Sequence, residues 1–207
     1  MDHTPCGLGI LCLALNTVFD FFFSQTMPLT IYTGGAKGVD THVERLSPVW
    51  SFVCGHHPTP RAKSLAPLTQ PDLDAAMPFV TRAAFQLGRH LSHPITLQYL
   101  QRNYHVIKPA PLVLALGYFD ELRKHVLGGT GWSVAMAQLL LKPLYVFDLD
   151  VEQWHWWNPT LQQYQPRDGM TYDQISLPTL QDNTAILGTR EEDKAVYPTL
   201  DALFQRS

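Results

Sequence analysis

Two glycine-rich stretches, each placed between an apolar segment and a segment with helix spacing, constrain this chain more than any other feature. The first is TGGAKGVD at residues 33–40, and the second is LGGTGWSV at residues 127–134. Glycine has no Cβ and accepts positive φ angles, so a ligand can approach its main chain closely. A helix that begins there also presents unpaired N–H groups and a positive dipole end to an anion. The stretches therefore predict two phosphate-binding loops, although tight strand-to-helix turns could need the same glycines for packing alone.

The first stretch has a strand before it and an amphipathic helix after it. Residues 29–33 are apolar and β-branched, and residues 39–46 carry apolar side chains at helix spacing. A lysine within the loop would supply positive charge if its ammonium group turns inward; otherwise it is a solvated loop residue. The residues of this stretch that we expect to contact a ligand are Gly34, Gly35, Lys37, Gly38 and Asp40.

The second stretch repeats this design, and a third strand end adds to it. Thr130 and Ser133 place hydroxyl groups at the start of the second helix. The segment AILGTR, residues 185–190, is an apolar strand that ends in glycine, threonine and arginine, and arginine suits bidentate contact with phosphate or carboxylate. The expected ligand contacts from these two segments are Gly128, Gly129, Thr130, Gly131, Trp132, Gly188, Thr189 and Arg190.

The rest of the chain alternates between strand and helix patterns. Further strands are predicted at residues 49–55, at 111–119, at 125–127 before the second glycine loop, and after the helix that follows that loop. Helices are predicted at 72–91, 97–104 and 195–204, and a loop rich in proline and histidine at 56–71. Such alternation predicts an α/β sandwich around a largely parallel sheet. In an open parallel sheet, glycine loops gather at the carboxyl ends of the strands, where ligands bind.

Charge and cysteine content limit the class of protein. The chain has 15 Lys and Arg against 18 Asp and Glu, a net charge of −3, which argues against broad nucleic-acid binding. The three cysteines, Cys6, Cys12 and Cys54, form no even disulfide framework. Free thiols in a reducing compartment are the simpler account, and we expect a cytoplasmic protein.

The N-terminal segment is apolar but does not have the pattern of a signal peptide or membrane anchor. Residues 6–23 have no basic residue before them, and Asn16 and Asp20 interrupt the apolar run. We therefore expect residues 1–26 to be an extension outside the fold and residues 27–207 to form a single domain without membrane contact. The alternatives are an extra helix packed on the domain and a targeting segment.

The glycine segments resemble those of a known group. TGGAKGVDTHVERL, LGGTGWSVAMAQLLLKPLYVFDLDVEQW and TAILGTRE are similar to segments of the SLOG superfamily, which includes YpsA-like proteins, the DNA-processing protein A family and the Lonely Guy phosphoribohydrolases. The strand AILGTR, which normally opens such a domain, stands near the C-terminus, so the order resembles the circularly permuted YpsA-like branch. The resemblance implies a Rossmann-like three-layer sandwich with a mainly parallel sheet. It also implies the binding or sensing of a nucleotide or nucleotide-derived ligand.

One departure from the resemblance bears on activity. Lonely Guy enzymes carry a glutamate shortly after a Gly-Gly-x-Gly-Thr loop, and it serves cleavage of the N-glycosidic bond. Aligning that loop on Gly128–Gly131 puts Trp132 in place of the threonine and Ala135 in place of the glutamate. An N-glycosidic bond hydrolase or transferase therefore remains an alternative that needs another carboxylate. The candidates are Asp40 and Glu44, which could equally be acids favoured by a helix dipole.

Other conspicuous residues favour ordinary roles. CGHH, residues 54–57, has no second ligand pair, so we predict no metal site. WHWW, residues 154–157, could stack a base but more often closes a core. Tyr118 and Phe119 follow a strand and could touch a base, with packing as the alternative. The sequence leaves the ligand, the cofactor and the oligomeric state open, a homo-oligomer included.

Overall fold

The computed structural model describes residues 29–53, 64–91, 93–122, 124–165, 179–190 and 196–205. The helices among them are α2 (Val39–Leu46), α3 (Gln70–Leu87), α4 (Pro94–Ile107), α5 (Gly128–Leu139) and α6 (Val196–Phe204). The strands are β1 (Ile31–Tyr32), β2 (Val49–Val53), β3 (Ser64–Pro67), β4 (Val113–Gly117), β5 (Leu144–Asp148), β6 (Gln153–Asn158), β7 (Gln163–Gln165) and β8 (Thr184–Gly188). In the described residues these strands form one eight-stranded sheet in the order β3-β2-β1-β8-β4-β5-β6-β7.

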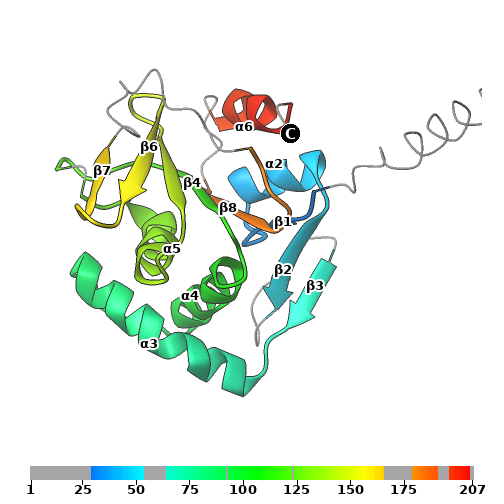
Figure 1. Cartoon of the computed structure of the whole chain (residues 1–207). Coiled ribbons are helices and arrows are strands. Elements are labelled where there is room, and N and C mark those ends of the chain that lie inside the picture. The colour runs from blue at the N-terminus through cyan, green and yellow to red at the C-terminus, as the bar shows by residue number, and fades with distance from the viewer. Residues whose placement is uncertain are drawn as a thin grey trace, which may run out of the picture.

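The sheet is parallel from β3 through β5 and antiparallel at the β6–β7 edge. Strands β4 and β5 are buried along their whole length, as strands covered on both faces are. Helices α3, α4 and α5 cover one face, and α2 and α6 cover the other (Figure 1). The predicted α/β, Rossmann-like three-layer sandwich with a mainly parallel sheet is confirmed.

The side chains of the central strands point alternately to the two faces of the sheet and so contribute to a hydrophobic core on each face. On β4, Val113 and Ala115 pack under α3, α4 and α5, whereas Leu114 and Leu116 pack under α2 and α6. Successive side chains of a strand point to opposite faces, so one apolar run serves both helical layers. All four side chains are fully buried.

The last strand of the chain lies in the middle of the sheet. Strand β8 pairs in parallel with β1, the first strand, on one side and with β4 on the other. Parallel strands end at the same edge, so the segments that follow β1, β8 and β4 meet there. The first glycine-rich stretch, before α2, follows β1, and the segment after β4 leads into α5, which begins with the second stretch.

Helix ends account for the boundaries of the long helix α3. Thr69 and Asp72 form a capping box, which starts the helix two residues before the predicted residue 72. Gly88 adopts a left-handed conformation with φ of 61° and ends the helix, four residues before the predicted end at 91.

Two sequence predictions need correction. The predicted loop at 56–71 contains β3, a four-residue edge strand that ends in proline and is too short to show a period. The predicted strand at 125–127 is reduced to a single bridge between Val126 and Phe119. Helix α5 begins at Gly128, so the second glycine stretch is the first turn of a helix and not a loop.

Of the remaining sequence features, some lie within the described residues and others lie outside them. WHWW forms most of β6, and its first tryptophan packs against Phe147 with ring centroids 5.3 Å apart. Residues 1–28 and the CGHH segment at 54–57 lie outside the described residues. In the part of the chain that is described, no helix has the length and apolar character needed to cross a membrane.

Packing at the end of β8 leads to a stability prediction. A Cβ at Gly188 would lie 2.3 Å from Cγ2 of the fully buried Val39 on α2. Gly188→Ala should therefore lower the free energy of unfolding by about 1–3 kcal/mol in urea denaturation, because two packed elements must separate. Gly129→Ala is the control, since its Cβ would meet no atom within 4 Å. Combining Gly188→Ala with Val39→Ala should cost less than the sum of the two changes; strict additivity would contradict this packing account.

Candidate functional site

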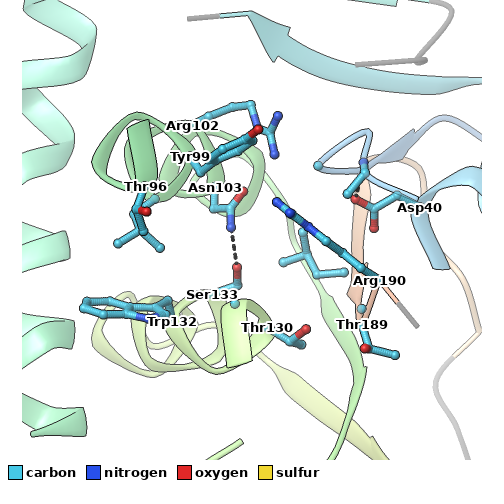
Figure 2. A pocket seen from close by; sticks show the side chains of 16 residues that line it. Asp40, Thr96, Tyr99, Arg102, Asn103, Thr130, Trp132, Ser133, Thr189 and Arg190 are labelled. Carbon is cyan, nitrogen blue, oxygen red and sulfur yellow. Dashed lines mark hydrogen bonds between the residues drawn. The ribbon is translucent and has the colours of Figure 1, made fainter. Parts of the chain in front are cut away.

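A cavity of about 300 Å³ lies at the edge of the sheet where β8 ends and α5 begins. Figure 2 shows it between α4, the start of α5, the loop after β8 and the start of α2. Eight of the residues predicted to contact a ligand line it: Gly34, Asp40, Gly129, Thr130, Trp132, Gly188, Thr189 and Arg190. The fold thus brings all three predicted segments to one place.

The other predicted contacts lie outside the lining, and two of the glycines have packing roles instead. Gly38 has φ of 81°, and a Cβ there would lie 2.5 Å from the carbonyl oxygen of Thr189. A Cβ at Gly131 would lie 1.8 Å from the carbonyl oxygen of Val126. Both glycines let a helix start sit directly on neighbouring backbone. The predicted contacts that do not line the cavity are Gly35, Lys37, Gly38, Gly128 and Gly131.

Asp40 is a buried carboxylate at the cavity wall. Its Oδ2 accepts a hydrogen bond from the N–H of Ala36 at 3.0 Å, which ties the first glycine loop to α2. Its Oδ1 has no hydrogen-bond partner among the described residues. Burial raises the pKa of Asp40 to about 7, and the Ala36 N–H and the charges of Arg102 and Arg190 offset part of that rise. The carboxyl group is thus poised to change charge near neutral pH.

Two arginines flank one aromatic ring of the cavity. The Cζ atoms of Arg102 and Arg190 each lie 5.2 Å from the ring centroid of Tyr99. Figure 2 shows Arg190 reaching from the loop after β8 toward the face of α4 that carries Tyr99 and Asn103. Guanidinium groups stacked on an aromatic ring keep their donors available for a carboxylate or phosphate. The pair brings two positive charges near Asp40, whose pKa both arginines lower.

The start of α5 forms the remaining wall. The N-cap residue, Leu127, offers no side-chain hydrogen bond to the first turn, so the N–H groups of that turn have no capping side chain. Thr130 from this turn and Ser133 from the next line the cavity, and Ser133 Oγ accepts a hydrogen bond from Nδ2 of Asn103 at 2.9 Å. Trp132 is buried beside them, with the Cζ of Arg89 6.0 Å from its ring centroid. A helix start of this kind attracts anions.

Helix α4 contributes residues that the sequence analysis did not single out. Tyr99, Arg102 and Asn103 stand at positions i, i+3 and i+4 and therefore share one face of the helix. Arg102 is buried, which is uncommon for an arginine. The sequence signal that could have identified them is the presence of Arg102 and Asn103 among the apolar residues of a predicted helix.

Several other candidates lie away from the cavity. Phe119 packs against Tyr164 with ring centroids 4.8 Å apart, and Tyr118 is half-buried outside the lining. Glu44 is half-buried on α2 and does not line the cavity. Ala135 is buried in the core under α5. Among the described residues, no group of three or more His, Cys, Asp and Glu side chains is placed to hold a metal ion.

Comparison with known proteins found little similarity in sequence. No protein-family model matches this chain. No curated protein matches it either. A crystal structure of a "putative molybdenum carrier protein" from Syntrophus aciditrophicus is similar in fold, with a TM-score of 0.46 and 14% sequence identity; the match covers 84% of this chain and 94% of that chain.

Titration of Asp40 should make stability depend on pH. Its pKa is about 7 in the folded protein against an ordinary value of 3.8 for an aspartate, so the folded state holds this proton more tightly than the unfolded state. Stability should therefore fall as pH rises from about 4 to about 7, by at most roughly 1.4 kcal/mol per pH unit.

Asp40→Asn is the matched test, because the amide oxygen can still accept from the Ala36 N–H but no longer titrates. Urea denaturation at several pH values should give a shallower slope for this variant than for the parent between pH 5 and pH 7. Equal slopes would show that Asp40 does not hold a proton near neutral pH.

Proposed function

We propose that this chain binds a nucleotide or a nucleotide-derived ligand in the cavity described above. The observation that carries the proposal is the convergence of Arg102, Arg190 and the uncapped start of α5 on one space. Phosphate is the biological anion that arginine pairs and helix starts bind most readily. The 300 Å³ volume is at the lower end of small-molecule pockets and suits a mononucleotide.

In this proposal the phosphate lies between Arg190 and the first turn of α5. Gly129 has open space where a Cβ would be, so phosphate oxygens can reach its main chain. Thr130 and Thr189 line the same part of the cavity and offer hydroxyl groups. We therefore keep as proposed ligand contacts only those predicted residues that line the cavity. To them we add four residues that line it and were not predicted: Tyr99, Arg102, Asn103 and Ser133.

The base has an aromatic partner available. Tyr99 and Trp132 are the aromatic residues that line the cavity in the described part of the chain. Two guanidinium groups lie 5.2 Å from the Tyr99 ring, whereas Trp132 has one, that of Arg89, at 6.0 Å, so Trp132 is the better stacking surface for a base.

We further propose that the chain is a circularly permuted SLOG-like domain over residues 27–207, with residues 1–26 outside it. The place of β8 between β1 and β4 supports this, because a strand that opens the domain in other members would occupy the same central position from the C-terminal end of this chain.

Calorimetry against AMP, GMP, CMP and UMP tests the ligand class. At least one should bind to the full chain, and Arg190→Ala should weaken that binding about tenfold or more without changing the melting temperature, because Arg190 is exposed. Gly129→Val should also weaken binding, because its side chain would project into the cavity. Arg45→Ala, an exposed arginine on α2 outside the cavity, is the control. Failure of all four nucleotides to bind, or equal binding by parent and Arg190→Ala, would contradict the proposal.

Asp40 favours a second candidate, an N-glycosidic bond hydrolase or transferase. A carboxyl group with a pKa of about 7 beside the ligand has the proton affinity that general acid–base catalysis requires. Against it, Ala135 stands where the Lonely Guy glutamate would be, and Asp40 already accepts a hydrogen bond from Ala36.

Incubation with the same nucleotides, followed by chromatography for free base, separates binding from turnover. We expect no free base above background, because a single hydrogen-bonded carboxylate does not replace the missing glutamate. Release of base by the parent that is lost in Asp40→Asn but kept in Glu44→Gln would instead assign the reaction to Asp40.

A further inference from the structure

A second and larger hollow lies on the far side of α5 from the nucleotide cavity. It has a volume of about 1190 Å³ and is formed by the C-terminal parts of α3 and α5, the segment after β4 and the β6–β7 hairpin. Figure 1 shows these elements at one end of the molecule, away from α2 and α6. We call it the α3–α5 groove. Its volume is above that of most small-molecule pockets and suits a segment of polypeptide.

The groove holds the most exposed large apolar side chains of the described residues. Phe85 is 91% exposed, Leu141 is 77% exposed and Leu122 is 72% exposed, and all three line it. Single exposed apolar residues are ordinary, but three gathered in one hollow mark a surface that contacts another molecule.

The backbone conformation of Leu141 is a second, independent indication that the groove contacts another molecule. It follows the last residues of α5 with φ of 52°, its N–H donates to Gln138, and the N–H of Lys142 donates to Ala137. This is the Schellman arrangement, in which glycine usually occupies the left-handed position. A leucine there costs backbone strain and is not buried by the described residues, which is the position expected of a side chain that contacts another molecule.

The charges of the groove indicate what that partner is. Arg82, Lys124 and His125 line it, and among the described residues that line it none is an aspartate or glutamate, in a chain whose net charge is −3. A second copy docked face to face would bring Arg82 and Lys124 against their own counterparts, which is unfavourable. An apolar segment that carries acidic side chains fits both the surface and its charge.

We propose that the α3–α5 groove is a docking site for an acidic, amphipathic segment of a partner protein. Leucine-like side chains of that segment contact Phe85, Leu122 and Leu141, and its carboxylates lie near Arg82 and Lys124. This mode is that of an amphipathic peptide laid in an apolar groove. The site is separate from the nucleotide cavity and does not depend on its function.

Fluorescence anisotropy with labelled synthetic peptides tests the proposal on the full chain. The probe is a helix-forming peptide with a leucine face and glutamates elsewhere; one comparison peptide replaces the glutamates with lysines, and another replaces the leucines with serines. The leucine–glutamate peptide should bind roughly tenfold more tightly than either comparison peptide at low salt, and less so at high salt. Equal affinity for all three, or no binding, would overturn the proposal.

Variants locate the site. Leu141→Gly should weaken peptide binding while leaving the melting temperature unchanged or higher, because glycine relieves the positive φ. Arg82→Glu with Lys124→Glu should reverse the preference toward the lysine peptide. Ile95→Ser, which removes a 55% exposed isoleucine outside the groove, is the matched control and should bind as the parent does.

The remaining outcomes also decide the question. Equal weakening by Leu141→Gly and Ile95→Ser would place binding elsewhere and overturn the assignment. A dimer in sedimentation that Leu141→Gly dissociates would assign the groove to a second copy instead. Nucleotide binding should be unchanged in Leu141→Gly, so the outcome here is independent of the outcome for the cavity.

Discussion

The close approach of α2 to the end of β8 is the contact on which the cavity depends. Gly38 rests on the backbone at Thr189, the N–H of Val39 donates to the Thr189 carbonyl oxygen at 3.4 Å, and Gly188 leaves room for the Val39 side chain. Any Cβ at either glycine would push the two elements apart. This contact brings Asp40, the second residue of α2, and Arg190, two residues beyond β8, into one cavity, where the charge of Arg190 lowers the pKa of Asp40.

That contact also explains why the sequence predicted the location of the site better than the roles of its glycines. A strand followed by glycines and a helix has a local pattern, so helix 39–46 was predicted at its observed bounds and three strand ends were expected to meet. Whether a glycine faces a ligand or a neighbouring backbone depends on residues far away in the chain. Gly38 meets Thr189, whereas Gly129 meets open space, although both stand in similar sequence patterns.

The site residues and the strand that were not predicted belong to elements whose role depends on packing and not on a local sequence pattern. Helix α4 was expected, but which of its faces would meet the cavity depends on how it packs against α3 and α5. The burial of Arg102 depends on this packing, because a charged side chain enters the interior only where other groups or a ligand compensate its charge. The edge strand β3 was missed for a related reason, because four residues paired on one side leave too short a pattern.

The balance of charge in the cavity links ligand binding to a proton. With Asp40 ionised, its carboxylate offsets one of the two arginines, and with Asp40 protonated both guanidinium charges face the ligand. Because burial already raises the pKa of Asp40 to about 7, a bound phosphate would raise it further by like-charge repulsion. Under the proposed function, nucleotide binding near neutral pH would therefore take up a proton, and affinity would fall as pH rises above about 7. The same carboxylate that holds the first glycine loop through Ala36 would thus also set how strongly the cavity attracts an anion.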